Sequence, residues 1–434
     1  MKKLVELMAL GGALAVGAEV PTVSNVTIAQ DAMTRLVTVG YTLSAPGIVT
    51  LDILTNGVSI GMANVRTVSG DMNKFVAAGD HQAYWQPSRD WPDMKFDDAI
   101  VSAEVTAWDR TTPPDYCAVN LKTGVRTFYT CEDALPGGIS NGVYRTEVLL
   151  MRRIPAAGAS FQMGDPQTDV ALLDFRANQY GSTHAHTVGF TNDYYIGVFE
   201  FTQGQTKTLA EQWNPSSFVG DHLPVHNINY QTIRGFSPNV NWPATGDFVV
   251  LDKNTVCGRM RLLTGGGGWD LPTEAQWEFA CRAGTTTAFN NGNEIGRDVN
   301  ANPTWSHDAN HPEVLDMAWC NSSRAQAGNV NGPQSVGQKL PNAWGLYDMS
   351  GNVWEFTRDW CRTDAEPGVF ANDAVEPVGE ATGSTRVIRG GAWDNEWFLM
   401  RSAARYNALR PDGGTQDVGF RLVCPANLML EMAR

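Results

Sequence analysis

The first hundred residues alternate apolar and polar positions with the period of a β-strand. Residues 37–43 alternate in this way, as do residues 49–53 and 101–107. Sequences rich in Gly, Pro, Asn and Ser separate these runs, as expected for turns between strands. Several short strands within residues 20–109 predict a small β-sandwich of immunoglobulin-like character. We expect this domain to serve as a spacer or to bind a partner.

Residues 110–146 are rich in Thr, Pro and Gly and predict a linker between two domains. Within it, Cys117 and Cys131 bracket a polar, turn-rich stretch whose flanking strands could fold back on each other. They are therefore the best candidate disulfide. The chain has seven Cys, and an odd number leaves at least one thiol unpaired or paired between chains. Cys281 lies in an apolar helical pattern and is expected to be a buried, inert thiol.

The second domain, residues 147–425, shows little regular periodicity and only a few clear helices. The clearest helix is predicted over residues 273–283. Thr273 can cap its start while Gln276 returns a hydrogen bond to the cap residue, and Gly284 ends it. The remaining order must come from loops that pack on aromatic side chains. The whole chain is thus predicted to be α+β, a β-sandwich followed by a loop-rich domain.

The N-terminus resembles a secretory signal sequence. Lys2 and Lys3 precede a mostly apolar run, and small residues at the end of residues 1–18 fit a cleavage site. Because Glu6 interrupts the apolar run, a buried N-terminal strand or helix is the alternative. No other segment approaches eighteen apolar residues, so no membrane span is expected. These features predict a secreted, periplasmic or cell-surface protein.

Composition and charge limit the classes of partner that the protein is expected to bind. With 43% hydrophobic residues, 14 Trp and 18% charged residues, the chain is globular. Its formal net charge of -14 repels phosphate backbones, so nucleic acid is not an expected partner. An acidic surface favours the binding of cations.

Ten sequence motifs between residues 148 and 424 resemble the formylglycine-generating enzyme, or sulfatase-modifying factor, family, and they stand in the family's order. They are Ile154-Pro-Ala-Ala-Gly158, Phe161-Gln-Met-Gly164, Tyr195-Ile-Gly-Val-Phe-Glu-Phe-Thr202, Leu223-Pro-Val225, Asp270-Leu-Pro-Thr-Glu-Ala-Gln-Trp-Glu-Phe-Ala-Cys-Arg-Ala-Gly284, Pro341-Asn-Ala-Trp-Gly-Leu-Tyr347, Asp348-Met-Ser-Gly-Asn-Val-Trp-Glu355, Arg389-Gly-Gly-Ala-Trp393, Arg401-Ser-Ala-Ala-Arg405 and Gly419-Phe-Arg-Leu-Val423. Any one of them alone is a weak signal, but their order makes the resemblance strong.

The resemblance implies a compact, loop-rich fold related to C-type lectins. The family includes copper-dependent oxidases that convert a sulfatase Cys to formylglycine, iron-dependent sulfur-transfer enzymes and members without known chemistry. The chain also resembles the variable ligand-binding proteins of diversity-generating retroelements, whose varied residues lie in the same C-terminal stretch. Fold alone therefore does not decide the function.

The chain lacks the thiols that the family's oxidases use. Those enzymes need two thiolates in the loop after the Arg-Gly-Gly motif, because soft sulfur ligands hold Cu(I). No Cys lies between Cys361 and Cys424. Met400 is a thioether and is expected to lie in the core. We therefore predict no catalytic residue, and neither copper nor iron is an expected cofactor.

The Asp348-Met-Ser-Gly-Asn-Val-Trp-Glu355 motif resembles the family's calcium loop. The resemblance implies side-chain oxygens from Asp348 and Glu355 and backbone carbonyls from Gly351 and Val353, which are the hard donors that Ca²⁺ prefers. The family's other calcium site has no counterpart, so one ion is predicted. The alternative is that both carboxylates accept hydrogen bonds from backbone N–H groups in turns.

Two other sets of residues do not indicate a site. His222 and His226, like His307 and His311, are four residues apart, a spacing that could hold zinc on a helix, but neighbouring Pro residues argue against helices there. Solvated loop histidines are the expectation. The Gly run at residues 265–268 lacks the Lys-Ser/Thr of a phosphate loop and predicts a flexible turn.

The C-terminal segment carries residue types that anchor interfaces. In the family this region lines the cleft where substrate docks, and Arg401 and Arg405 are expected to hold its loop. Ordinary packing of aromatic side chains is the alternative. The predicted ligand-binding residues are Trp393, Asp394, Asn395, Glu396, Trp397, Phe398, Tyr406, Asn407 and Arg410.

These observations predict a secreted or envelope-associated protein that binds a protein or glycan ligand through its C-terminal cleft, without redox chemistry. Calcium is predicted to stiffen the loop of residues 348–355 beneath that cleft. One alternative is a metal-dependent oxidoreductase of the same family, with an altered copper centre or a non-haem iron centre. Another is a structural surface protein whose sandwich mediates assembly.

Overall fold

A computed structural model of the chain describes most of its residues. The described ranges are residues 20–92, 100–109, 112–164, 185–211, 213–235, 251–266, 268–294, 312–328, 330–361, 374–377, 379, 382–427 and 429. The predicted signal sequence lies outside them. No described helix is long and apolar enough to cross a membrane.

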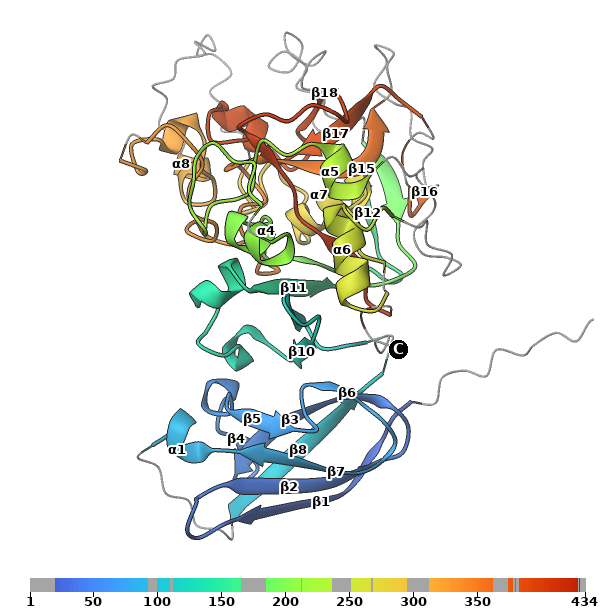
Figure 1. The fold of residues 1–434 in the computed structure, drawn as a ribbon, viewed down its shortest axis with the longest axis vertical. Helices are drawn as coiled ribbons and strands as arrows, with labels where there is room; N and C mark the ends of the chain where they lie inside the picture. Colours follow the sequence, from blue (N-terminus) through green and yellow to red (C-terminus); the bar gives the residue numbers. More distant parts are fainter. Residues whose placement is uncertain are drawn as a thin grey trace, which may run out of the picture.

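The N-terminal part contains two antiparallel sheets (Figure 1, blue). One has the order β1(Val23–Gln30), β2(Val37–Leu43), β7(Gly79–Trp85), β5(Val68–Gly70); in the other, β3(Gly47–Thr55) pairs with β4(Val58–Ser59), β6(Lys74–Val76) and β8(Val101–Trp108). The alternating apolar residues of β2 and β3 form one core between the sheets. Two short helices, η1(Met62–Asn64) and α1(Pro87–Asp90), complete this part. Its immunoglobulin-like character stays a prediction.

The segment expected to be a linker instead forms part of a sheet. This five-stranded sheet has the order β10(Arg126–Tyr129), β9(Tyr116–Asn120), β11(Val148–Ile154), β14(Tyr194–Gly197), β20(Val423–Pro425). All of its pairings are antiparallel. Residues 116–129 thus contribute its first two strands.

The predicted disulfide between Cys117 and Cys131 is wrong in this structure, where both cysteines are free. Cys117 faces the core that contains Leu149 and Met151. Cys131 packs on the opposite side, against the cluster that contains Tyr129 and Leu150. Two thiols on opposite faces of one sheet cannot be bridged without moving the backbone.

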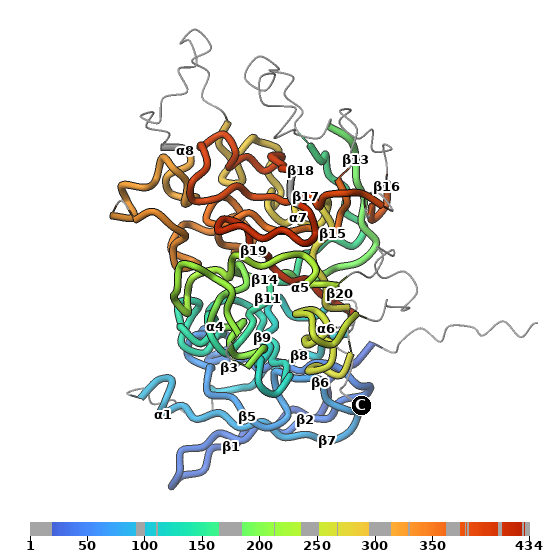
Figure 2. Tube along the Cα trace, turned by 45° about the horizontal axis from the view of Figure 1, so that its top comes forward, coloured from blue at the N-terminus to red at the C-terminus, as the bar shows by residue number. Residues whose placement is uncertain are grey.

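Two smaller sheets and several short helices complete the second part of the chain (Figure 2). The sheets have the orders β18(Arg405–Leu409), β17(Thr385–Arg389), β15(Trp354–Cys361), β19(Val418–Gly419) and β12(Ser160–Met163), β13(His186–Gly189), β16(Ala374–Val375). The helices are η3(Glu132–Ala134), η4(Gly142–Arg145), α4(Gln203–Leu209), α5(Tyr230–Arg234), α6(Val256–Leu263), α7(Glu274–Arg282), α8(Pro312–Leu315), η5(Asn321–Ser323) and η6(Trp397–Met400).

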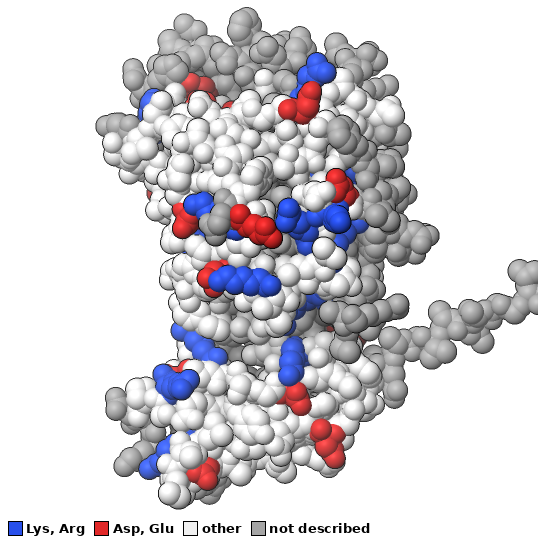
Figure 3. Space-filling model, viewed as in Figure 1, with Lys and Arg blue, Asp and Glu red and all other residues white. Residues whose placement is uncertain are grey.

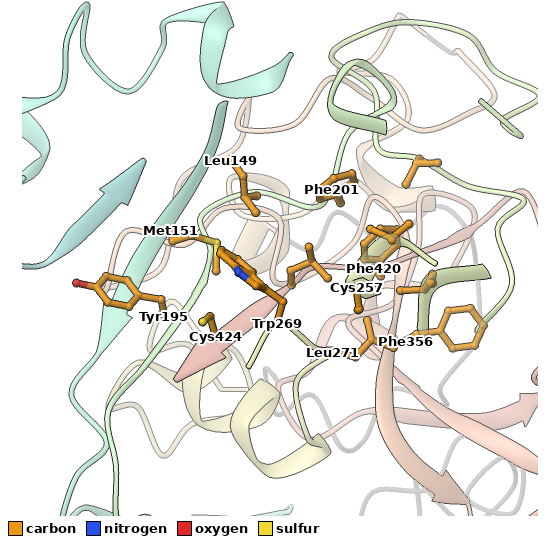
Figure 4. Packing of buried hydrophobic residues seen from close by; sticks show 14 of the residues in the cluster. Leu149, Met151, Tyr195, Phe201, Cys257, Trp269, Leu271, Phe356, Phe420 and Cys424 are labelled. Atoms are coloured by element: carbon orange, nitrogen blue, oxygen red, sulfur yellow. The ribbon is translucent and has the colours of Figure 1, made fainter. Parts of the chain in front are cut away.

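The helix predicted from its capping sequence is confirmed as α7. The Thr273 hydroxyl accepts a hydrogen bond from the Gln276 N–H, and the Gln276 side chain accepts from the Thr273 N–H. Ala283 adopts a left-handed conformation directly after the last turn. Loops and strands meet on a core rich in aromatic residues, in which Trp269 lies between Met151 and Leu271 (Figure 4).

The two parts of the chain touch at β10 and at η3. The Phe128 N–H donates to the Asn73 carbonyl at 2.7 Å, and Arg66 donates to the Asp133 carbonyl at 2.9 Å. Ile48 of β3 packs in the core of the second part. On the face drawn in Figure 3, basic and acidic side chains alternate in a band across the middle instead of forming a patch of one sign.

Candidate functional site

The Arg-Gly-Gly motif is held in the core by two carboxylates of α7. Arg389 donates from Nε to Glu274 Oε1 at 2.9 Å and from Nη2 to Glu278 Oε2 at 2.7 Å. Its Nη1 donates to the carbonyls of Ser402 and Ala404 at 3.1 and 3.2 Å. All three charged side chains are almost fully buried. This single guanidinium therefore joins the helix to the segment that follows the predicted ligand loop.

Of the two arginines expected to hold this loop, Arg401 bonds to it, whereas Arg405 bonds to α7. Arg401 donates to the Phe398 carbonyl at 2.9 Å. Arg405 donates from Nη2 to Glu274 Oε2 at 3.1 Å. Burial alone would raise the pKa of Glu278, but Arg389 and Arg282 hold it below its usual value. The carboxylate is therefore charged at neutral pH.

The loop after Arg-Gly-Gly is a tight turn. Asn395 accepts from the Ala392 N–H through its side chain at 3.0 Å, and its own N–H donates back to the Ala392 carbonyl at 3.0 Å. The Asn321 N–H donates to the Asn395 carbonyl at 2.9 Å. Leu399 and Met400 are buried in the core, so the prediction for Met400 is confirmed.

Trp393 lies deeper than its place among the predicted ligand-binding residues implies. Its side chain is 8% exposed, and its ring meets Phe218 edge-on at 5.9 Å between centroids. The indole N–H is buried, and no described residue accepts a hydrogen bond from it. Trp393 is thus mainly a packing residue, with one unsatisfied donor.

Trp397 and Phe398 form the aromatic part of the turn. Both are half-buried and meet edge-on at 6.1 Å between ring centroids. Trp397 also lies 6.4 Å from the Phe289 ring. Tyr406, in the neighbouring strand β18, is half-buried against Trp354 at 5.8 Å. We call residues 394–398 the aromatic loop.

The polar residues of the predicted site differ in exposure. Asp394 is exposed, and Glu396 is half-buried with its carboxylate 3.5 Å from the Asn321 amide. Arg410 is 77% exposed and lies 3.6 Å from Asp412. The side chain of Asn407 lies outside the described part of the chain. The structure therefore brings residues 394–398 together on one turn and places Arg410 on a separate exposed segment.

Asp348 offers one oxygen to a cation. Its Oδ2 accepts from the Gly337 N–H at 2.7 Å, whereas its Oδ1 is buried and has no partner among the described residues. Burial raises the pKa of this carboxyl to about 6. A buried carboxylate oxygen without a donor is costly unless a proton or a metal ion satisfies it.

Glu355, the other predicted carboxylate ligand, is already paired. Arg421 donates to both of its oxygens at 2.6 to 2.8 Å, and Trp277 donates to Oε2 at 2.7 Å. The N–H groups of Gly351 and Val353 donate to Gly390 and Glu200. The predicted ligand set thus fits calcium only in part, because Glu355 would first have to release Arg421. Among the described residues, no three His, Cys, Asp or Glu side chains are placed to hold a metal ion.

Glu200 joins the same buried network and was not predicted from the sequence. Its Oε2 accepts from the Asn352 amide at 2.6 Å, and its Oε1 accepts from the Val353 N–H at 3.0 Å. Burial raises its pKa well above the usual value, and the charges of Asp348 and Glu355 raise it further. The signal that could have revealed it is an acidic residue within the apolar run Gly-Val-Phe-Glu-Phe.

Comparison with known sequences decides the family. The profile of the sulfatase-modifying factor enzyme 1-like domain matches residues 145–426, well over half of the chain. The chain belongs to this family.

Individual relatives match parts of this chain, which is a member of the sulfatase-modifying factor family. Chaperone protein LppX of Paenibacillus barcinonensis is 29% identical over 220 residues, which are 46% of this chain and 70% of that protein. The formylglycine-generating enzyme of Mus musculus is 32% identical over 158 residues, 36% of this chain and 38% of the enzyme. Among solved structures, Treponema denticola variable protein 1 is 26% identical with a TM-score of 0.44, covering 64% of this chain and 95% of that one.

In this family member the cysteines are core residues. Six of the seven are buried, and Cys131 is half-buried. Burial raises the pKa of Cys281 to about 11 and that of Cys257 still higher. Such thiols stay protonated at neutral pH, whereas metal binding and nucleophilic attack need thiolates. The prediction that Cys281 is buried is confirmed.

The family domain also buries a histidine that was expected to be solvated. The Nε2 atom of His226 accepts from the N–H groups of Ser217 and Phe218, both at 3.1 Å. Its Nδ1 lies 3.2 Å from the Pro224 carbonyl, so this nitrogen carries the proton. Burial lowers the pKa of His226. It is a neutral side chain that shapes the loop before it, while His222 is exposed and no helix joins the two.

Proposed function

We propose that this domain binds a ligand, a protein or a glycan, through the aromatic loop and Tyr406, without redox chemistry. The observation that carries the proposal is the aromatic loop itself. Half-buried Trp397 and Phe398 stand where the family resemblance places the thiolates of the oxidases. Partly exposed aromatic rings anchor interfaces, because they bury a large area with few rotatable bonds.

The frame around the loop suits this role. Arg389 and Arg401 bind the backbone carbonyls of Ser402 and Phe398, so the loop ends do not depend on the exposed side chains. The Paenibacillus relative is named a chaperone protein, which favours a protein ligand over a glycan. The signal-like N-terminus supports secretion or attachment to the cell envelope.

Ligand capture tests the proposal. A partner captured from the cell envelope should bind the Trp397→Ala/Phe398→Ala double variant at least about tenfold more weakly than the wild type. The matched control is Trp213→Ala, a 38% exposed tryptophan outside residues 394–398, which should bind normally. A captured partner that binds the double variant as tightly as the wild type would contradict the proposal.

A metal inventory separates this proposal from an oxidoreductase. Purified protein should contain well below one copper or iron per chain, and a peptide with the sulfatase Cys motif should remain unoxidised in the presence of copper and oxygen. Stoichiometric copper or iron, or formylglycine in the peptide, would establish the enzymatic alternative.

We also propose that calcium binds at the loop that contains Asp348. The unpartnered Oδ1 atom of this carboxylate supports the proposal. Added Ca²⁺ should raise the melting temperature by a few degrees relative to chelator, since about 1 kcal/mol shifts Tm by roughly 2–4 °C in domains of this size. Asp348→Asn should abolish the increase, and Asp412→Asn, an exposed carboxylate, should keep it. Equal melting temperatures of the wild type with and without Ca²⁺ would refute the site.

A further inference from the structure

A groove lined mainly by polar side chains lies on the sheet β1-β2-β7-β5. Most of its lining faces away from the core between the two sheets, but Tyr41 is buried in that core. The volume of the groove is about 690 Å³, within the ~300–1,000 Å³ typical of ligand pockets. Apart from two glycines, every lining residue has a polar group in its side chain. The lining residues are Asn25, Thr27, Gly40, Tyr41, Thr42, Gly70, Asp71, Asp80, His81, Gln82 and Tyr84. We call this the outer groove. It lies on the N-terminal part, away from the aromatic loop (Figure 1).

Two glycines create the hollow. In the sheet register, Gly40 lies between Thr27 of β1 and Gln82 of β7, so backbone forms the floor between these side chains. Gly70 has a φ of 84°, and a Cβ there would lie 2.6 Å from the Gln82 carbonyl oxygen. A side chain at position 70 would therefore be both strained and in collision with β7.

The walls are hydrogen-bonding side chains that hold one another in place. Asn25 donates to the Thr42 hydroxyl at 3.2 Å, and this hydroxyl donates to Asp80 Oδ1 at 2.6 Å. On the other side, the Tyr84 hydroxyl donates to Gln82 Oε1 at 2.8 Å. The Gln82 amide N–H groups have no acceptor among the described residues. Side chains that are fixed before binding lose less conformational entropy when a ligand arrives.

The charges of the outer groove exclude anions. Asp71 forms an ion pair with Lys74 at 3.0 Å, and its Oδ2 lies within hydrogen-bond distance of His81 Nδ1, also at 3.0 Å. Asp80 forms no ion pair with any described Lys, Arg or His and keeps a net negative charge in the groove. Phosphates, acidic sugars and nucleic acids are therefore repelled. The lack of aliphatic side chains in the lining likewise disfavours an apolar peptide.

We propose that the outer groove binds a neutral oligosaccharide. Sugar hydroxyls both donate and accept hydrogen bonds, which matches the carboxylate acceptor of Asp80 and the amide donors of Gln82. The half-buried ring of Tyr84 presents an apolar surface to the C–H groups of a sugar ring. The groove is a second site, on a different domain from the aromatic loop.

The test uses the full chain on an array of neutral oligosaccharides, including cellopentaose, chitopentaose and mannopentaose, with calorimetry on the best binder. Tyr84→Ala and Gln82→Ala should each weaken binding at least about tenfold. The matched control is Glu104→Ala, an exposed carboxylate of β8 in the other sheet, which should bind like the wild type. Binding should change less than about twofold between 50 and 500 mM salt, because the ligand is uncharged.

The outcomes separate the two proposed sites. Weaker binding by the two groove variants, together with wild-type affinity in the Trp397→Ala/Phe398→Ala variant, places the sugar in the outer groove and leaves the aromatic-loop proposal to its own test. No binder on the array, unchanged affinity in both groove variants, or preference for an acidic polygalacturonate pentasaccharide would each overturn the proposal.

Discussion

Replacing Arg389 by methionine is expected to destabilise the family domain by about 3–5 kcal/mol, because two buried carboxylates each lose one of their two arginine partners. Glu274 and Glu278 are each no more than 1% exposed in their ion pairs with Arg389. The same change removes the donors that hold the carbonyls of Ser402 and Ala404. Small domains have only about 5–15 kcal/mol of stability in total. Urea unfolding followed by tryptophan fluorescence measures the loss.

Two variants make this result interpretable. Arg389→Lys keeps the charge but loses the planar fork, so it should recover only part of the stability. Lys122→Ala breaks an exposed pair with Glu147, with side chains 56% and 48% exposed, and should cost less than about 1 kcal/mol. A methionine variant that unfolds at the wild-type urea concentration would show that the network does not stabilise the fold.

Changing Asp359 to asparagine is expected to alter how stability depends on pH. Burial, followed by the nearby charge of Glu274, raises the pKa of Asp359 to about 7. Between pH 4 and 7 the folded chain therefore holds a proton that the unfolded chain has lost, so the free energy of unfolding falls as pH rises through this range. Between pH 5 and pH 8, titration of Asp359 lowers the free energy of unfolding of the wild type by about 2–3 kcal/mol. Because asparagine does not titrate, the Asp359→Asn variant should not show this decrease in the free energy of unfolding.

Urea unfolding at pH 5 and pH 8 measures the effect. The difference between the two pH values should be about 2–3 kcal/mol smaller in Asp359→Asn than in the wild type. The asparagine oxygen can still accept the hydrogen bond that the Glu274 N–H donates to Asp359 at 2.7 Å. Asp412→Asn, at an exposed carboxylate, serves as the control. Identical pH dependence in the wild type and Asp359→Asn would contradict the raised pKa.

Features encoded by neighbouring residues were predictable from the sequence. The helix α7 follows from a cap and its reciprocal partner three residues later, and β2 and β3 follow from alternation within single strands. Family membership follows from the order of short motifs. Each of these signals lies within a short stretch of sequence.

Features that join distant segments were not predictable. The residues of β9 and β10 were predicted to be a linker, because only the pairing of β9 with the later strand β11 shows that this hairpin belongs to a sheet. The pairing of Glu355 with Arg421, 66 residues later, turned a predicted calcium ligand into half of an ion pair. The disulfide prediction considered the spacing of Cys117 and Cys131 but not the faces of the sheet on which they lie.

The pairing of β14 with β20 constrains how the protein is made. Residues 194–196 pair with residues 423–425, so a strand synthesised early must wait for one that is synthesised more than two hundred residues later. Long-range pairings of this kind slow folding, and an unpaired sheet edge can associate with other chains in the meantime. A nascent chain interrupted before residue 423 would therefore expose the edge of β14 and tend to aggregate.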